Sequence, residues 1–258
     1  MKRVLVTCGT GEIGRRIATL LATHGHEVIV TGRNPDTLTS FVSMLPDLGS
    51  RKHSCACVDF SSEDKVKSGI VELSALGPVD DLVLMVPRIP PTKEVLPAAS
   101  SWFALWQTVF VGPLELVRSF LAASPEPAGR RKVVIISGIS SVQVIEHYAA
   151  NNALRAAWVA QAKTLAFAYG PQRVHFNTLS LGGVMTDKYS ARLAEMAKQA
   201  GRSFEEQLAS EVANVPLRKY ASLDEVANAV RLLLSDFTDH MTGQNFAFEG
   251  GFFKSYAS

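Results

Sequence analysis

A glycine-rich turn near the N-terminus constrains the fold more than any other feature of this sequence. It occupies residues 8–14 and directly follows the first apolar run, 3–7. Gly9, Gly11 and Gly14 give the spacing G-x-G-x-x-G between a predicted strand and a predicted helix. Glycines at this spacing permit a tight turn and bring the free N–H groups of a helix N-terminus close to a diphosphate. The turn therefore predicts a dinucleotide-binding fold; the alternative is that these glycines only turn the chain.

Short apolar runs alternate with segments of helical period along the rest of the chain, which is typical of a parallel sheet covered by crossover helices. Seven runs are predicted as strands, mostly apolar at consecutive positions as in strands buried on both faces: 3–7, 27–31, 54–59, 81–86, 132–137, 174–180 and 245–248. Further helices are predicted around Trp158, over 102–121, and over 223–235 with Ser222 or Asp224 as the cap. We therefore predict a single-domain α/β protein over residues 1–258, with a Rossmann-type, doubly wound sheet of about seven parallel strands and helices on both faces.

Composition and charge exclude several classes of protein. Of 258 residues, 47% are hydrophobic and 19% are charged, which fits a globular domain rather than a disordered or fibrous chain. Lys and Arg number 26 against 24 Asp and Glu, without a dense basic run, so a nucleic-acid partner is disfavoured. The three cysteines and six histidines form no metal-ligand motif, and we predict reduced thiols and no metal site. No apolar stretch resembles a leader peptide or a membrane span, so we expect a cytoplasmic protein with no membrane partner.

The end of the second predicted strand indicates which nucleotide is preferred. Dinucleotide folds that prefer NAD usually carry a carboxylate there for the ribose hydroxyls, but this chain reads Thr31-Gly32-Arg33-Asn34. A guanidinium at Arg33 suits a 2′-phosphate through charge-assisted hydrogen bonds. We therefore predict NADP(H) in preference to NAD(H). The alternative is that Arg33 is only a solvated residue at the start of a helix.

Five segments, in order and over nearly the whole chain, resemble the short-chain dehydrogenase/reductase family. Residues 7–14 resemble its TGxxxGxG loop in the TGGTGxIG form with Cys8 at a glycine, and 58–60 resemble the Asp that contacts adenine. Residues 148–154 resemble the start of its YxxxK helix, 176–186 resemble N-x-x-x-P-G-x-x-x-T with Leu181 at the proline, and 241–251 resemble the closing TGQ…DGG. The resemblance implies a small-molecule substrate and a nucleotide site that comprises Gly9, Gly11, Glu12, Ile13, Gly14, Arg33, Asp59, Phe60, Val86 and Thr186.

The same resemblance implies an atypical member with an altered catalytic tetrad. In the family a Tyr transfers the proton, a Ser holds the substrate oxygen, a Lys lowers the pKa of the Tyr and holds the nicotinamide ribose, and an Asn supports the Lys. The positions that correspond to Asn, Ser, Tyr and Lys here are Val109, Gly138, Tyr148 and Asn152. The interval from Gly138 to Tyr148 is shorter than in the family, so the serine's role is open to Ser140, Ser141 or Ser137. The candidate catalytic residues are Tyr148, Ser140 and Asn152.

The surviving tyrosine favours reduction over oxidation. An isolated phenol has a pKa of about 10, so it is a poor base at neutral pH but still a proton donor. Apolar residues follow the fourth predicted strand (85–90) and precede Tyr148 (142–145), at the sheet edge where ligands bind in such folds. We therefore predict an NADPH-dependent carbonyl reductase with Tyr148 as the proton donor and an apolar or aromatic carbonyl substrate.

Two other functions remain open. One is a non-redox lyase, dehydratase or isomerase that uses Tyr148 with Ser140 or His147 for proton transfer. Relatives that dehalogenate halohydrins replace the family's Lys by Arg and fill the nucleotide cleft, whereas Asn152 and the retained glycines of this chain argue against that variant. The other is a catalytically silent nucleotide-binding protein, which the losses at Val109, Gly138 and Asn152 favour.

Two expectations concern the surface. Residues 186–214 are polar and lie between a strand and the last helix, so they form either a mobile cover over the substrate or an ordinary solvated helical excursion. The helices of 102–121 and 148–168 correspond to those that pair subunits in the family, and this resemblance implies a homodimer or homotetramer.

Overall fold

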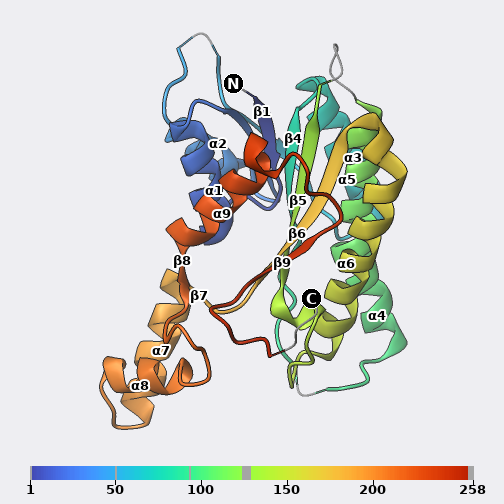
Figure 1. The fold of residues 1–258 in the computed structure, drawn as a ribbon. Coiled ribbons are helices and arrows are strands. Elements are labelled where there is room, and N and C mark those ends of the chain that lie inside the picture. The colour runs from blue at the N-terminus through green and yellow to red at the C-terminus, as the bar shows by residue number, and fades with distance from the viewer. Residues whose placement is uncertain (1, 50, 93, 124–128, 255–258) are drawn as a thin grey trace.

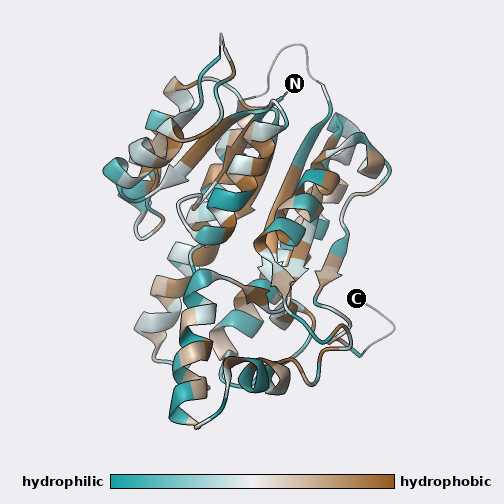
Figure 2. Cartoon of the chain, turned by 90° about the vertical axis from the view of Figure 1, so that its left-hand side faces the viewer, coloured by the Kyte–Doolittle hydropathy of each residue, from teal (hydrophilic) through white to brown (hydrophobic). Residues whose placement is uncertain are grey.

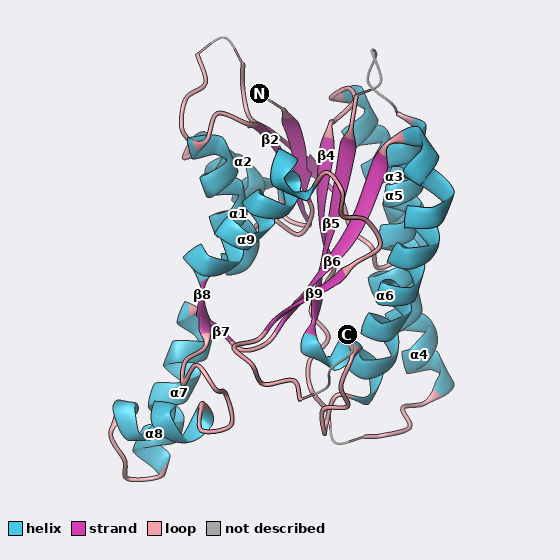
Figure 3. Cartoon of the chain, viewed as in Figure 1, coloured by secondary structure: helices cyan, strands magenta, loops and turns pink. Residues whose placement is uncertain are grey.

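The structure is a computed structural model that describes residues 2–49, 51–92, 94–123 and 129–254. Seven strands form one parallel sheet in the order β3-β2-β1-β4-β5-β6-β9 (Figures 1 and 3). The prediction of a Rossmann-type sheet is confirmed, and each strand end lies within two residues of its predicted place. The strands are β1 (Arg3–Val6), β2 (Glu27–Gly32), β3 (Ser54–Cys57), β4 (Asp81–Met85), β5 (Arg131–Gly138), β6 (Val174–Leu181) and β9 (Asn245–Phe248).

Successive residues of the central strands supply two hydrophobic cores, one on each face of the sheet. Val4 and Val6 of β1 belong to the core beneath α1, α2 and α9, whereas Leu5 belongs to the core beneath α3, α5 and α6. This alternation follows from the two-residue period of a strand, because neighbouring side chains point to opposite faces. Strands that are apolar on both faces need helices on both sides, and Figure 2 shows the hydrophobic strands enclosed in this way.

The covering helices are α1 (Glu12–Thr23), α2 (Pro35–Ser43) and α9 (Leu223–Leu234) on one face, and α3 (Glu63–Ala75), α5 (Gly112–Ala122) and α6 (Ala149–Tyr169) on the other (Figure 1). Of the two predicted caps of α9, Ser222 is the one used. Its hydroxyl accepts from the N–H of Glu225, and the Glu225 carboxylate accepts from the N–H of Ser222. This reciprocal capping box fixes the residue at which α9 begins.

The single helix predicted over 102–121 is interrupted. The structure contains α4 (Ala99–Trp106), a π-helical turn at Gln107–Val111, and then α5. A π turn inserts one residue into the helical ladder and often lies at a functional site. The turn contains Val109, the residue that the sequence motifs align with the family's Asn. Its carbonyl oxygen accepts a hydrogen bond from Nε1 of Trp158 at 2.8 Å.

The strand order reverses between β1 and β4, and ligands bind at such a point at the carboxyl ends of the strands. Thr7 ties the two strands together there, because its hydroxyl donates to the carbonyl oxygen of Met85 (2.6 Å) and accepts from the N–H of Met85 (2.8 Å). The glycine-rich turn of residues 8–14, which we call the phosphate loop, therefore starts from a fixed point.

Residues 184–222 leave the sheet and return to it, and we call this segment the arm. Its ends pair as two short parallel strands, β7 (Val184–Met185) and β8 (Ala221–Ser222), and between them lie α7 (Asp187–Gln199) and α8 (Phe204–Glu211). Figure 1 shows α7 and α8 projecting beyond the carboxyl edge of the sheet. Among the described residues, no helix is both long enough and apolar enough to cross a bilayer, and no three His, Cys, Asp or Glu side chains group as metal ligands would.

Candidate active site

The phosphate loop connects β1 to α1 and is packed too tightly for side chains at two of its glycines. A β carbon on Gly14 would lie 2.6 Å from Cα of Gly9, and one on Gly9 would lie 2.6 Å from Cγ1 of Val30. Gly11 precedes the first residue of α1 and gives the helix no side-chain cap. The first N–H groups of α1 are therefore available to an anion, as in nucleotide-binding loops.

Cys8 occupies the one position of this loop that adopts a left-handed backbone, with φ of 47°. The family's loop has glycine here, and glycine is the residue that adopts this conformation at least cost. Burial raises the pKa of the Cys8 thiol to about 12, although the positive charge of Arg33 lowers it. The thiol is therefore protonated at neutral pH and acts as a small apolar group in the loop.

Glu12 links the phosphate loop to the arm. Its carboxylate accepts hydrogen bonds from the backbone N–H groups of Asp187 (2.5 Å) and Lys188 (3.3 Å), at the start of α7. Thr186 caps the same helix end, since its hydroxyl accepts from the N–H of Tyr189 at 3.1 Å. Glu12 and Thr186, both predicted to contact the cofactor, thus lie together where the N-termini of α1 and α7 meet.

The residues predicted for the adenosine end lie after β2 and β3. Arg33 is exposed directly after β2 and has no carboxylate partner among the described residues. Burial alone would raise the pKa of Asp59, but hydrogen bonds from Lys65 and Ser61 lower it. Phe60 is buried, and its carbonyl oxygen lies close to Gly112 at the start of α5. The exposed guanidinium and the ionised carboxylate leave this edge polar.

Tyr148 is half-buried and directly precedes α6. The residue before it, His147, has a left-handed backbone with φ of 62°, and its carbonyl oxygen accepts from the N–H of Thr92 at 2.8 Å. Asn152 is one turn further on, and its side-chain amide pairs with the backbone of Ile145 on both sides, donating at 3.2 Å and accepting at 3.4 Å. The structure therefore places Asn152 against the loop that precedes Tyr148.

Arg155 is the cation of this region, and the sequence analysis did not single it out. Its Nη1 donates to the hydroxyl of Ser140 at 3.1 Å. A β carbon on Gly138 would lie 2.6 Å from Cζ of Arg155, so the guanidinium fills the space beside that glycine. Burial lowers the pKa of Arg155, and the nearby Tyr148 partly opposes this effect. Tyr148, Ser140 and Arg155 therefore lie in one neighbourhood.

The remaining candidate serines point elsewhere. The hydroxyls of Ser141 and Ser180 lie 2.9 Å apart, and Ser180 also donates to Oδ1 of Asn245 at 2.7 Å. The hydroxyl of Ser137 is buried and has no hydrogen-bond partner among the described residues. Of the three candidates, Ser140 is the one bonded to the cation.

Aromatic side chains of the arm face the same region. The ring of Tyr220 covers Gly183, where a β carbon would lie 2.6 Å from Cγ of the ring. Burial raises the pKa of Tyr220, and Tyr148 contributes to the increase. Tyr220 packs edge to face against Tyr189, whose hydroxyl donates to Glu211 at 2.9 Å. The base of the arm is therefore an aromatic wall of Tyr189 and Tyr220, and Tyr148 is near enough to affect the pKa of Tyr220.

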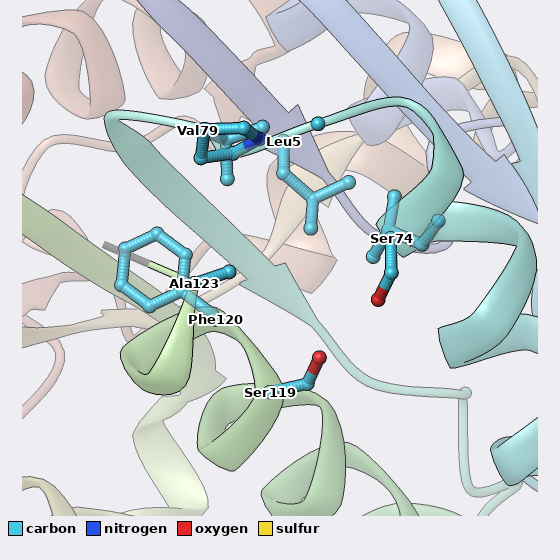
Figure 4. Close-up of a pocket in the computed structure, with 9 residues that line it drawn as sticks. Leu5, Ser74, Val79, Ser119, Phe120 and Ala123 are labelled. Atoms are coloured by element: carbon cyan, nitrogen blue, oxygen red, sulfur yellow. The ribbon is translucent and has the colours of Figure 1, made fainter. Parts of the chain in front are cut away.

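Two cavities differ in their relation to this region. Figure 4 shows a pocket of about 30 Å³ lined by Leu5, Ser74 and Phe120, at the amino edge of the sheet where α3 and α5 end, so it is remote from the residues described above. A larger cavity, of about 490 Å³, lies between the base of the arm and the segment after β9, and Gly183, Lys219 and Phe248 are among its lining residues. The larger cavity adjoins the aromatic wall.

Comparison with known proteins identifies the family. A family model described as "Enoyl-(Acyl carrier protein) reductase" matches residues 10–253. The chain is 26% identical over 255 residues to a protein named glucose 1-dehydrogenase from Gluconobacter oxydans, covering 97% of this chain and 91% of that protein. This chain belongs to the short-chain dehydrogenase/reductase family.

Two solved structures have the same fold. One is L-sorbose reductase from Gluconobacter frateurii, in complex with NADPH and L-sorbose, with a TM-score of 0.89 at 21% sequence identity. The match covers 98% of this chain and 97% of the reductase chain. The other is a short-chain oxidoreductase from Pseudomonas aeruginosa, solved with NADPH bound and described as containing an atypical catalytic center. Its TM-score is 0.85 at 22% sequence identity, and the match covers 98% of this chain and 97% of the oxidoreductase chain.

The loop residues fit a dinucleotide of the kind bound in those structures. The uncapped N-terminus of α1 offers N–H donors, and the space around Gly9 and Gly14 admits no side chain. Arg33 presents a free charge at the end of β2, where a 2′-phosphate is recognised in such folds. Glu12 is the acidic side chain in the first turn of α1.

Proposed function

We propose that this protein is an NADPH-dependent carbonyl reductase that acts on an apolar or aromatic carbonyl substrate. The observation that supports the proposal most is the combination of an uncapped glycine loop with an exposed Arg33. The family match over 10–253 supports oxidoreductase chemistry. The proposed nucleotide contacts are the loop residues, the residues after β2 to β4 and the start of α7: Gly9, Gly11, Glu12, Ile13, Gly14, Arg33, Asp59, Phe60, Val86 and Thr186.

In the proposed mechanism NADPH supplies a hydride when bound, and this chain supplies the proton. Tyr148 donates its phenolic proton to the substrate oxygen, a step that needs no prior deprotonation. Ser140 positions Arg155 through their 3.1 Å hydrogen bond. Asn152 keeps the Ile145 loop in place and thereby positions Tyr148, and its amide is engaged there rather than free for a ribose.

The arm is proposed as the cover of the substrate site. Its aromatic base faces Tyr148, and the 490 Å³ cavity beside it is lined by Leu217, Ala247 and Phe248 among others. These apolar residues favour an apolar or aromatic substrate. The protein is also proposed to form a homodimer or homotetramer, since Phe103 of α4 and Phe167 of α6 are 76% and 79% exposed on the helices that pair subunits in the family. Light scattering of the purified protein tests this assembly.

Titration with NADPH and NADH, followed by fluorescence of the reduced nicotinamide, tests the cofactor. Arg33→Ala is expected to weaken NADPH binding about tenfold or more, because a hydrogen bond to a charged group contributes about 1.5–3 kcal/mol. Binding of NADH should stay unchanged. The matched control is Arg51→Ala, because Arg51 precedes the amino end of β3 whereas Arg33 follows the carboxyl end of β2. If neither nucleotide binds, the proposed function is wrong; if NADPH binds but no ketone is reduced, the protein is a silent nucleotide binder.

Arg155 also favours a second function, a non-redox enzyme that uses proton transfer. Asn152 at the family's Lys position had argued against the arrangement of the halohydrin-dehalogenating relatives, yet the structure brings an arginine into the same neighbourhood as Tyr148. A guanidinium and a phenol together can stabilise an oxyanion without a hydride. Turnover of a halohydrin or an epoxide in the absence of nicotinamide would support this function over the reductase.

A further inference from the structure

The space that a side chain at position 138 would fill is occupied by Arg155. Gly138 is buried at the end of β5, and a β carbon there would lie 2.6 Å from Cζ of Arg155 and nearer still to Nη1. A serine at position 138 and the present guanidinium are therefore mutually exclusive. In the family this serine holds the substrate oxygen, so the glycine makes room for a different donor at the same place.

The spacing along α6 fits an arginine that starts from the place of the family's lysine and reaches the place of its serine. Asn151 and Arg155 are four residues apart, as in the family's Y-x-x-x-K, and the interval from Gly138 to Asn151 is three residues longer than the short interval to Tyr148. Tyr148, Asn151 and Arg155 recur at the spacing of one helix face. Asn151 is 1% exposed and donates to the carbonyl oxygen of Ile89 at 3.4 Å, while its Oδ1 has no partner among the described residues. Because Oδ1 is an acceptor and repels an anion, the donors of that face that remain for an anionic ligand are Tyr148 and Arg155.

The charge of Arg155 lacks a counterion within the described part of the chain. No carboxylate lies within ion-pair distance of it, and its one hydrogen bond goes to the neutral hydroxyl of Ser140. Only burial and Tyr148 affect its pKa, so no acidic residue compensates the charge from a distance either. Arg155 is half-buried, and a charge partly removed from water is costly unless it is paired and hydrogen-bonded, so the site favours an anionic ligand.

The geometry of a guanidinium specifies the anion further. Its planar fork presents parallel N–H donors that match two oxygens of one planar group, and one hydrogen bond to Ser140 leaves most of these donors unused. An α-keto acid has a carbonyl oxygen and a carboxylate oxygen side by side and carries the compensating charge. A simple ketone lacks both features, and an ester of the keto acid lacks the charge.

We propose, on the basis of the reductase function above, that Arg155 is a catalytic residue that holds the reacting oxygen in place of the missing serine, and that the substrate is an apolar or aromatic α-keto acid. In this reaction the carbonyl carbon accepts a hydride, with NADPH as the reductant, and the electron pair of the C=O π bond moves to the oxygen. The oxygen takes the phenolic proton of Tyr148, and the product is an α-hydroxy acid. Water then reprotonates the Tyr148 phenolate.

The test compares phenylglyoxylate with its methyl ester, which keeps the ketone and the neighbouring carbonyl oxygen, adds one methyl group and removes the charge. The wild-type protein is expected to reduce the acid with the higher kcat/KM. Arg155→Gln is expected to lower kcat/KM for the acid about 100-fold or more, the loss typical of removing an oxyanion donor, and to narrow the difference between acid and ester. Arg155→Lys keeps the charge without the planar pair of N–H donors, and its kcat/KM for the acid is expected to lie between those of the wild type and Arg155→Gln. Arg51→Gln is the matched control.

Gly138→Ala provides an independent variant. The added methyl group meets the flexible end of Arg155 rather than backbone, so the protein is expected to fold while the guanidinium is displaced, and KM for the acid rises. Gly170→Ala, where no atom lies within 4 Å of the new β carbon, is the control. An Arg155→Gln protein that reduces the acid within threefold of wild type, or a wild type that prefers the ester, overturns the inference.

A thermal-shift measurement separates this inference from the reductase function. If the wild type binds no NADPH and reduces neither compound, the reductase proposal fails on its own. Stabilisation by phenylglyoxylate, absent with the ester and lost in Arg155→Gln, still supports an anion site at Arg155. Equal shifts for the variant and the wild type, or no shift at all, contradict it.

Discussion

The carboxylate of Glu12 accepts the backbone N–H of Asp187 at 2.5 Å, so one acidic side chain occupies the meeting point of two helix N-termini. A bound diphosphate is attracted to the same N–H donors. Glu12 therefore holds the start of α7 against the phosphate loop, and its negative charge weakens the binding of the diphosphate beside which it is proposed to lie.

Glu12→Gln is expected to tighten NADPH binding by about two- to fivefold, because a charge near a helix N-terminus is worth about 0.3–1 kcal/mol. The same change should lower thermal stability slightly, since the attraction between Glu12 and the N-terminus of α7 is lost. Fluorescence titration and thermal unfolding measure the two effects, with Glu63→Gln in α3 as the control. Weaker NADPH binding by the variant would show that Glu12 helps to hold the cofactor, as the sequence predicted.

Gly14→Ala is expected to destabilise the protein by about 1–3 kcal/mol, the usual cost of overpacking. The new β carbon would lie 2.6 Å from Cα of Gly9, and backbone atoms cannot move aside cheaply. Gly11→Ala is the matched control, because its β carbon would lie 3.8 Å from the nearest atom. Urea unfolding of the two variants should differ clearly; equal midpoints would mean that the loop is looser than described.

His147→Asn is expected to leave activity close to that of wild type. The His147 side chain is exposed, and Asn tolerates its left-handed backbone. His147→Val is expected to lower stability by about 1–2 kcal/mol and to disturb Tyr148, since a β-branched residue is strained there. Steady-state kinetics with thermal unfolding separates the two variants. Loss of activity in His147→Asn would support proton transfer by His147, as in the non-redox alternative.

The stability of the protein should fall in mild acid. Burial lowers the pKa of His175, and also that of His26, below the usual value of 6.5. A histidine whose pKa is lower in the folded protein stabilises it fully above the unfolded value, and this contribution is lost as the pH falls through the folded value. Unfolding free energies measured from pH 7 downward should therefore decrease below about 6.5, and less steeply in His175→Gln. A variant at the exposed His240 is the control.

The sequence predicted the sheet and the loop because both depend on local patterns. The strand runs are apolar on consecutive residues, and Gly9 to Gly14 have one spacing that a tight turn can use. Ser222 and Asp224 were equal as caps in the sequence; the structure selects Ser222 because Glu225 completes the capping box.

The cation of the site could not be found in the same way. The letters of 148–154 match the start of the family's helix, so Asn152 was aligned with the Lys, whereas Arg155 reaches Gly138 only through its length and the absence of a β carbon. The available signal was the number of residues between the family's Ser and Tyr. Counted from Gly138, this interval fits the pair Asn151 and Arg155 better than the pair Tyr148 and Asn152. The contact of Glu12 with Asp187 joins residues 175 positions apart, and no local pattern reports such a pair.

The arm leaves the sheet after β6 and returns at α9 through two strands that pair with each other. Because its two ends are held side by side, residues can be inserted into or deleted from α7 and α8 without shifting any strand of the sheet. If the arm covers the substrate as proposed, selection can change the size of the substrate it accommodates while the phosphate loop and Arg33 stay fixed. Descendants of one such gene can then diversify in substrate without rebuilding the proposed nucleotide site.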